Sequence, residues 1–267
     1  MIVDERRNKI KAILAEKRSV KASDLAKEFS VSEETIRRDL SKLEKDGLVK
    51  KNYGGAILVE ELKKFDPAPV EERQQKHYKE KKLIGEKAGE LVEDEQIIII
   101  DAGTTTWHLS RNLQDRSGLM VISNALNIAE ECSKNDTDVF VLGGKLRKKT
   151  MSMVGPQAEA ELAKYNAAYT FLGTSGISPK RGFTSFDLYE AAVKGAMVDA
   201  GNKIVILADH SKFNKEGLVS FAQFKDVDIL VTSDLVDKDI LKQIKEAGIE
   251  VIVTPVADEL AVFEESS

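Results

Sequence analysis

Basic and hydroxyl side chains are concentrated between residues 32 and 45, close to the amino terminus. In a helix over this segment, Ile36, Leu40 and Leu43 form one narrow apolar stripe and the basic residues project from the other side. Arginine can donate two hydrogen bonds to a guanine edge and lysine can hold a phosphate, so such a helix suits the major groove of DNA. A solvated helix whose basic face binds nothing shows the same pattern. The residues predicted to contact DNA are Ser32, Thr35, Arg37, Arg38, Ser41, Lys42 and Lys45 on the helix and Lys51 and Tyr53 on a following hairpin.

A segment rich in glycine and hydroxyl groups, residues 101–106, follows the apolar run 97–100 and reads Asp-Ala-Gly-Thr-Thr-Thr. A glycine that lets a ligand approach the backbone, threonine hydroxyls and the free N–H groups of a helix start together favour phosphate binding without a lysine. Neither a Walker loop nor a dinucleotide fingerprint is present. A helix capped by threonine explains the same residues, so the segment alone leaves both interpretations open.

Polar residues also follow other apolar runs of the chain. One such segment, Asp209-His210-Ser211-Lys212, places an ammonium group at the end of a predicted strand. The carboxyl ends of parallel strands meet at one edge of a sheet, and ligands bind there. We therefore expect Lys212 to face a phosphate at that edge, with an ordinary surface lysine as the alternative. The other segments, for which caps and tight turns are the alternatives, are Ser123-Asn124, Gly143-Gly144-Lys145 and Gly173-Thr174-Ser175-Gly176.

Residues suited to metal binding or nucleophilic catalysis are few. The three histidines, His77, His108 and His210, are too scattered along the chain to suggest a triad or a metal site, although His210 neighbours Lys212. The single Cys132 excludes a disulfide framework and a cysteine-based zinc site, which favours a reducing, cytoplasmic setting. The amino terminus is charged, and no apolar run approaches the ~20 residues that span a bilayer. The sequence thus predicts no catalytic residue, metal, cofactor or membrane association.

Charge is divided unevenly between two predicted domains. Residues 1–57 hold 14 of the 40 basic and 10 of the 45 acidic residues, a net charge of +4 against −9 elsewhere. Three helical patterns and a strand pair predict a winged helix-turn-helix domain over this basic part. The polar stretch 58–77 is predicted to be a linker, although a helical pattern already starts at Val70, and residues 78–267 form the larger domain.

The larger domain is predicted to be α/β with a mainly parallel sheet. Its apolar runs are continuous, as expected for strands covered on both faces, and segments 188–200 and 238–247 fit crossover helices. The predicted strands are 97–100, 120–122, 139–142, 169–172, 204–207, 229–231 and 251–253.

The segment 35–40, Thr-Ile-Arg-Arg-Asp-Leu, followed by Leu43-Glu44, Gly47 and Tyr53-Gly54-Gly55-Ala56, resembles the DNA-binding signature of the DeoR family of bacterial regulators. The resemblance implies that Thr35, Arg37 and Arg38 face DNA, whereas Asp39 braces the domain because phosphate repels a carboxylate.

The larger domain resembles the DeoR-family sensor domain, which is similar in fold to ribose-5-phosphate isomerase. The resemblance is carried by Asp101-Ala102-Gly103-Thr104-Thr105 and by Asp209, Ser211 and Lys212. It implies that Thr104, Thr105 and Lys212 hold a phosphoryl group and that Asn124, Gly173 and Lys194 line the same cavity. The full predicted effector site is Asp101, Gly103, Thr104, Thr105, Thr106, Asn124, Gly173, Glu190, Lys194, Asp209 and Lys212.

Two functions remain open at this point. The first is a repressor of a carbohydrate-catabolic operon whose affinity for double-stranded operator DNA changes when a phosphorylated sugar binds. The second is a sugar-phosphate isomerase with an appended DNA-binding module, which needs a carboxylate base. The isomerase carries aspartates in the loop that corresponds to residues 173–177, where this chain has glycine and hydroxyls, so only Asp187 and Glu190 remain as acids. A single winged helix makes few contacts, so we expect a homodimer or homotetramer.

Overall fold

The computed structural model describes residues 2–17, 19–52, 54–58 and 68–256 and divides into two compact units, Met1–Asp66 and Pro67–Ser267. Each unit has its own apolar core. Helix α5 (Val70–Gln75), which falls inside the predicted linker 58–77, belongs to the second unit. Tyr53, predicted to contact DNA, lies outside the described residues.

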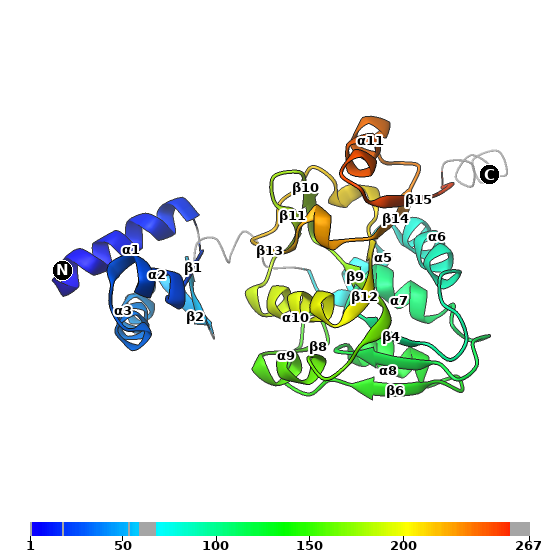
Figure 1. Cartoon of the computed structure of the whole chain (residues 1–267), viewed down its shortest axis with the longest axis horizontal. Coiled ribbons are helices and arrows are strands. Elements are labelled where there is room, and N and C mark those ends of the chain that lie inside the picture. The colour runs from blue at the N-terminus through cyan, green and yellow to red at the C-terminus, as the bar shows by residue number, and fades with distance from the viewer. Residues whose placement is uncertain (1, 18, 53, 59–67, 257–267) are drawn as a thin grey trace. The chain divides into compact units, whose positions relative to one another are not determined.

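The described part of the first unit contains three helices and a small antiparallel sheet (Figure 1). Ile10, Leu25, Ile36, Leu40 and Leu43 are buried together, which confirms that the apolar stripe of the third helix faces the core. The helices are α1 (Val3–Lys17), α2 (Ala22–Phe29) and α3 (Glu33–Lys45). The strands, in the order β1-β3-β2, are β1 (Ser19–Lys21), β2 (Val49–Asn52) and β3 (Gly55–Leu58).

Local sequence fixes both ends of α3 and the turn of the wing. The Ser32 side chain accepts a hydrogen bond from the Thr35 N–H at 3.2 Å and so caps the helix. Gly47, just beyond the helix, has φ of +73°, a conformation that glycine adopts without strain. At Gly55 a Cβ would lie 1.8 Å from the Val20 carbonyl oxygen, so only glycine lets β1 pair with β3 there.

The second unit is built on a seven-stranded parallel sheet in the order β15-β14-β12-β9-β4-β5-β6. All seven predicted strands are present, which confirms the predicted α/β class. The order reverses between β4 and β9, and such a switch point leaves a crevice at the carboxyl ends of the strands. The strands are β4 (Ile97–Ile100), β5 (Met120–Ser123), β6 (Asp138–Val141), β9 (Ala167–Gly173), β12 (Gly201–Leu207), β14 (Ile229–Ser233) and β15 (Glu250–Thr254).

Alternate residues of each strand belong to two separate apolar cores, because successive side chains of a strand point to opposite faces. Ile98 and Ile100 pack on one face with residues of α6, α7 and α8, and Ile99 packs on the other with residues of α9, α10 and α11. No helix among the described residues has both the length and the apolar character needed to cross a membrane. The helices that pack on the two faces of the sheet are α6 (Tyr78–Gly89), α7 (Thr104–Ser110), α8 (Leu126–Cys132), α9 (Pro156–Leu162), α10 (Leu188–Asp199) and α11 (Lys238–Glu246).

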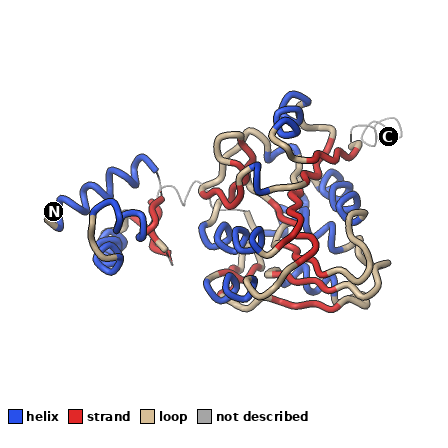
Figure 2. The backbone as a smooth tube through the Cα atoms, in the orientation of Figure 1, coloured by secondary structure: helices blue, strands red, loops and turns tan. Residues whose placement is uncertain are grey.

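Two small antiparallel sheets, which the apolar pattern did not predict, accompany the main one (Figure 2). They contribute short loops and turns near the carboxyl ends of the main strands. The first pairs β7 (Lys145–Arg147) with β8 (Ser152–Val154). The second has the order β10-β11-β13, with β10 (Gly176–Ser178), β11 (Gly182–Ser185) and β13 (Val219–Ala222). The 3₁₀ turns are η1 (His210–Lys212) and η2 (Phe224–Asp226).

Candidate functional site

The basic side chains of α3 are exposed and only weakly paired. Arg37 approaches Glu33 at 3.3 Å and Arg38 approaches Glu34 at 3.4 Å, each one turn earlier in the helix. The Arg38 side chain is 79% exposed. Exposed pairs of this kind contribute about 0.3–0.5 kcal/mol, so both guanidinium groups can exchange a carboxylate for a base edge or a phosphate.

Asp39 differs from its neighbours because its side chain is buried. Its two carboxylate oxygens accept hydrogen bonds from Arg6 Nε at 2.6 Å and Arg7 Nε at 2.9 Å. Both arginines belong to α1, so the carboxylate ties α3 to α1. This placement fits a bracing role and keeps the negative charge away from the exposed face.

The other predicted DNA contacts divide into exposed and internally bonded groups. Lys42 and Lys45 are exposed on α3, and Lys42 Nζ donates to Asp46 Oδ1 at 2.8 Å. The Ser32 and Thr35 hydroxyls bond to one another at 2.9 Å, and Ser41 Oγ donates to the Arg37 carbonyl at 2.7 Å. Lys51, on the wing, donates through Nζ to Ser41 Oγ at 2.6 Å. The bonds of Lys51 and Ser41 join the wing to the exposed face of α3.

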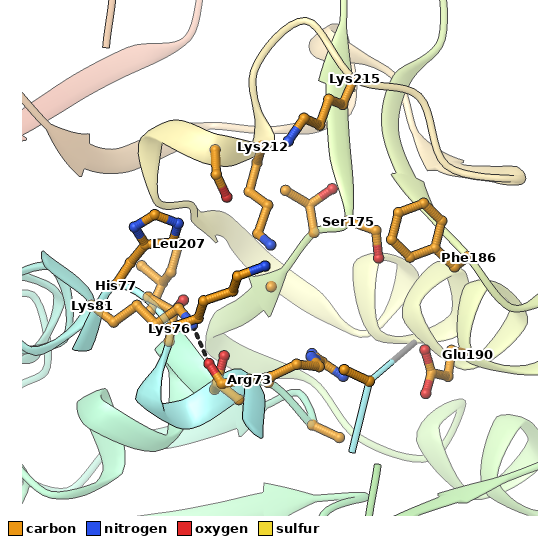
Figure 3. Close-up of a pocket in the computed structure, with 18 of the residues that line it drawn as sticks. Arg73, Lys76, His77, Lys81, Ser175, Phe186, Glu190, Leu207, Lys212 and Lys215 are labelled. Carbon is orange, nitrogen blue, oxygen red and sulfur yellow. Dashed lines mark hydrogen bonds between the residues drawn. The ribbon is translucent and has the colours of Figure 1, made fainter. Parts of the chain in front are cut away.

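A cavity of about 460 Å³ lies at the carboxyl ends of the central strands of the second unit (Figure 3). Strand-end loops, α5, the start of α6 and the turn after β12 all contribute to its wall. Six of the lining residues are lysine or arginine and two are glutamate, which suits an anionic ligand. The lining residues are Ala68, Glu72, Arg73, Lys76, His77, Lys81, Ala102, Gly103, Thr104, Thr105, Gly173, Thr174, Ser175, Phe186, Glu190, Lys194, Leu207, Ser211, Lys212 and Lys215.

A buried ion pair lies at the switch point of the sheet. Asp101, directly after β4, pairs with Lys194 of α10, and both side chains are less than 10% exposed. Lys194 Nζ also donates to the Gly173 carbonyl at 2.8 Å, and the Gly173 N–H donates to Asp101 Oδ2 at 3.2 Å. Because this network joins β4, β9 and α10, it fixes the floor of the cavity and neutralises the Lys194 charge.

Lys212 enters the cavity from the η1 turn. Its ammonium lies 3.8 Å from the fully buried Asp209 carboxylate. Burial lowers the pKa of Lys212, against the opposing effect of Asp209, and nearby Arg73, Lys215 and Lys76 lower it further. Burial works to raise the pKa of Asp209, but Lys212 and the Ser211 hydroxyl outweigh it and hold that pKa below its usual value. Asp209 therefore remains a carboxylate and holds Lys212 beside the cavity.

One wall of the cavity comes from residues that the sequence analysis did not select. Arg73 belongs to α5, Lys76 follows the end of that helix, and His77 and Lys81 lie at the start of α6. Lys81 Nζ donates to the Arg73 carbonyl at 2.5 Å, and burial lowers the pKa of Lys81 to about 8. The sequence feature that could have revealed these residues is the helical pattern that starts at Val70. Its basic residues also fit a solvated linker, so the pattern does not point to a cavity.

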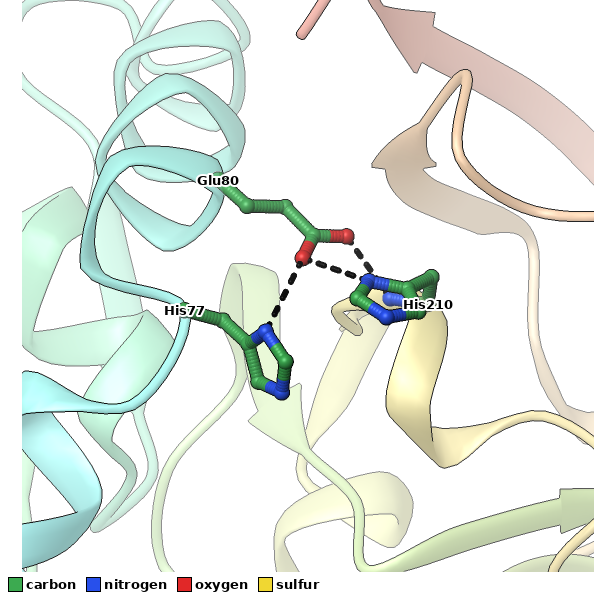
Figure 4. Close-up of side chains that lie close together, drawn as sticks. All are labelled: His77, Glu80 and His210. Carbon is green, nitrogen blue, oxygen red and sulfur yellow. Dashed lines mark hydrogen bonds and ion pairs between the residues drawn. The ribbon is translucent and has the colours of Figure 1, made fainter. Parts of the chain in front are cut away.

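His77 and His210 lie together around the buried Glu80 (Figure 4), although they are far apart in the sequence. Their rings meet edge to face with centroids 4.7 Å apart. Glu80 accepts hydrogen bonds from the His210 N–H at 2.7 Å, from His210 Nδ1 at 2.8 Å and from Ser233 Oγ at 2.5 Å. These bonds connect α6 with β14 and with the turn that carries Lys212, so we interpret the cluster as a brace for that turn.

The predicted effector residues fall into two groups. Gly103, Thr104, Thr105, Gly173, Glu190, Lys194 and Lys212 line the cavity. The remaining four, Asp101, Thr106, Asn124 and Asp209, are buried and lie outside the lining. Thr106 Oγ1 donates to the Asp101 carbonyl at 2.7 Å, and Asn124 Oδ1 accepts from the Ala102 N–H at 3.1 Å. Thr106 and Asn124 therefore shape the loop that follows β4, and His210 also lies outside the lining.

Comparison with known protein families agrees with this two-unit architecture. The family model of the DeoR C-terminal sensor domain matches residues 76–234, and that of the DeoR-like helix-turn-helix domain matches residues 6–62. The chain belongs to the DeoR family. Its curated DeoR-family relatives include the HTH-type transcriptional regulator GlpR of Haloferax volcanii, which is 31% identical over 94% of this chain and 98% of the relative. The putative aga operon transcriptional repressor of Escherichia coli O157:H7 is 30% identical over 93% of each chain.

Solved structures similar to this DeoR-family chain include ribose 5-phosphate isomerases. The enzyme from Plasmodium falciparum covers 50% of this chain and 52% of its own, with 14% identity and a TM-score of 0.38. The likeness is confined to about half of each molecule.

Proposed function

We propose that this DeoR-family chain is a cytoplasmic transcriptional repressor. It binds an operator through α3 and the wing, and a phosphorylated sugar that binds in the cavity controls this binding. The observation that carries the proposal is the basic cavity at the switch point of the sheet, where Lys212 and the threonines after β4 lie on one lining. A sugar phosphate supplies the negative charge that this lining favours.

The chain order suggests how ligand binding reaches the DNA-binding unit. Arg73 belongs to the first helix described after the boundary between the two units, Lys76 directly follows that helix, and both residues line the cavity. The Val70 N–H donates to the Lys149 carbonyl at 2.9 Å, which anchors the start of α5 on the second unit. A ligand that binds beside α5 therefore favours one arrangement of the chain segment that joins the two units. Control of DNA binding requires only that the DNA-bound and the released arrangement differ in affinity for the ligand.

We further propose that the chain acts as a homodimer or homotetramer. The reading surface is one 13-residue helix with a short wing, which contacts a single half-site. Two copies related by a two-fold axis would read a palindromic operator. Light scattering at micromolar concentration would contradict this if the protein were a monomer.

A mobility-shift titration with the full-length protein tests the proposal. The DNA probes are the promoter of the protein's own gene and a random duplex of equal length. Each is titrated with and without a panel of pentose and hexose phosphates. We expect a preference for the promoter that at least one sugar phosphate reduces. Equal binding to both duplexes under all conditions would contradict the proposal.

An isomerase is the second candidate, because Glu190 lines the cavity and could act as an acid or base. Two contacts argue against turnover. Glu190 lies 3.5 Å from Arg147 and forms an ion pair with it, and Asp187 Oδ1 accepts the Tyr189 and Glu190 N–H groups as a helix cap. Burial nevertheless raises the pKa of Asp187. Ketose formation from an aldose phosphate that is abolished by Glu190→Gln would favour the enzyme.

A further inference from the structure

Five positive side chains surround one part of the cavity, and we call them the cation cluster: Arg73, Lys76, Lys81, Lys212 and Lys215. In Figure 3 the side chains of Lys76, Lys212 and Lys215 extend from different segments toward the same region. Lys212 is close enough to Arg73, Lys76 and Lys215 for their charges to disfavour its protonated form. The cluster therefore acts as one field of positive charge.

Few carboxylates pair with the cations of this cluster. The buried Asp209 faces Lys212, and the buried Asp209 and Glu80 both attract the Lys81 ammonium. Among the residues that the structure describes, Arg73, Lys76 and Lys215 form no ion pair with a carboxylate. Glu72 is exposed and lines the cavity.

The remaining charged groups on the lining have partners outside the cluster. Lys194 is paired with Asp101, so it adds little to the positive field. Glu190 shares Arg147 with Asp187, and Figure 3 places Glu190 apart from the side chains of Lys212 and Lys215. The carboxylates around the cluster are thus the buried Asp209 and Glu80 and the exposed Glu72, and neither Lys76 nor Lys215 forms an ion pair with any of them.

A phosphate monoester carries a charge of about −1.5 to −2 at neutral pH, and when it binds at Lys212 the exposed Lys76 and Lys215 still have no carboxylate partner among the described residues. We propose that the ligand is a phosphorylated sugar with a second anionic group, either another phosphate or a carboxylate, and that Lys76 and Lys215 bind this second group. Both lysines are exposed and belong to different segments on either side of Lys212, so a larger anion can reach them while its phosphate stays at Lys212. This inference rests on the proposed function of the cavity.

Isothermal titration of the full-length protein at constant ionic strength tests the inference. Inorganic phosphate and pyrophosphate form the first pair of probes, because they differ in charge and involve no sugar stereochemistry. Pyrophosphate should bind at least about tenfold more tightly, since each added charge meets unpaired cations. Fructose 6-phosphate, fructose 1,6-bisphosphate and 6-phosphogluconate then show whether a phosphate or a carboxylate is the better second group.

The double variant Lys76→Met and Lys215→Met assigns the effect to those two residues. It should lose most of the preference for pyrophosphate, because its affinity for pyrophosphate falls more than its affinity for inorganic phosphate. Lys134→Met is the matched control, because Lys134 pairs with Glu131 after α8, at the amino ends of the strands and away from the cavity. This control should behave as the parent protein does.

The outcomes separate the inference from the proposed function. If phosphate and pyrophosphate bind the parent equally, or if the double variant weakens both alike, the second anion subsite is wrong. Release of the operator by a sugar monophosphate would then still support the proposed function. If no phosphate-bearing probe binds, both the inference and the proposed function fail.

Discussion

The two units of the chain use buried carboxylates in the same way and basic side chains in opposite ways. Asp39 fastens α3 to α1 through Arg6 and Arg7, as Asp101 fastens α10 to the sheet through Lys194. The first unit then displays its arginines on an exposed helix, whereas the second collects its lysines around a cavity. Basic side chains on an exposed helix suit the groove of a long polymer, and basic side chains around a cavity suit a small anion.

The comparison also shows how differently the two sites are assembled. One helix, α3, carries most of the predicted DNA contacts. The cavity combines residues that lie as far apart as Glu72 and Lys215. A substitution in α3 should therefore act locally, whereas one in the cavity can act through several elements.

The largest predicted effect is the loss of the first unit's stability in Asp39→Ala. Removal of one partner from a buried ion pair costs about 3–5 kcal/mol, because Arg6 is left buried without its carboxylate. Calorimetry should show a lower melting temperature for the first unit and an unchanged transition for the second. Lys194→Met should give the reverse pattern. A single transition that moves equally in both variants would contradict two independent cores.

The next effect concerns control of DNA binding by the cavity, in Lys212→Ala. A hydrogen bond to a charged group contributes about 1.5–3 kcal/mol, so effector affinity should fall by roughly 10- to 150-fold. Operator affinity without effector should stay at the parent value. The test is a mobility-shift titration with sugar phosphate, and Lys134→Ala is its control. A normal effector response in Lys212→Ala would remove Lys212 from the site.

Arg38→Ala should weaken operator binding and leave effector binding unchanged, which is the opposite of the result expected for Lys212→Ala. Loss of a base contact costs about 1–3 kcal/mol and relaxes sequence preference, while the cavity is untouched. Fluorescence anisotropy should show weaker operator binding, and thermal shift with the sugar phosphate should match the parent. Equal operator affinity of variant and parent would show that the exposed arginine does not read DNA.

The smallest effect is a dependence of effector binding on pH through Lys81, whose pKa burial lowers to about 8. The protonated form attracts phosphate, so affinity should be highest below pH 8 and fall severalfold between pH 7 and 9. The phosphate itself loses its second proton near pH 6, so its charge barely changes in this range. Titration calorimetry should show a flatter profile for Lys81→Met. A parent profile that rises above pH 8 would contradict this assignment.

Stability should show the reverse trend over a higher range. The lowered pKa means that the folded state binds the Lys81 proton more weakly than the unfolded state, whose lysine pKa is about 10.4. The Lys81 contribution therefore favours folding increasingly as pH rises from about 8 to 10.4. Chemical denaturation of the parent and of Lys81→Met over this range would isolate the difference.

Helix α3 and the seven-stranded sheet were predicted well from the sequence, because both depend on a local pattern of apolar residues. The spacing of Ile36, Leu40 and Leu43 determines which face of α3 is buried, and seven continuous apolar runs mark seven doubly covered strands. The short antiparallel strands β10, β11 and β13 lack such runs and were not predicted. Their pairing depends on contacts with segments distant in the sequence.

The cavity was only partly predictable for the same reason. Lys212 and Thr104 follow strands, so topology places them at one edge. Arg73 and Lys76 reach the cavity only because α5 packs on the second unit, and a basic segment after two prolines resembles a solvated linker. The meeting of His77 and His210 around Glu80 also depends on tertiary packing, which sequence spacing does not reveal.

The most direct test of the central claim is a reciprocal measurement of coupling between the two units. The affinity of the full-length protein for its operator is measured with and without a saturating sugar phosphate, and its affinity for that sugar phosphate is measured with and without the operator. We predict that the two ratios are equal and lie between about 5 and 150, as expected for coupled sites. A sugar phosphate that binds the cavity and leaves operator affinity unchanged would contradict the account.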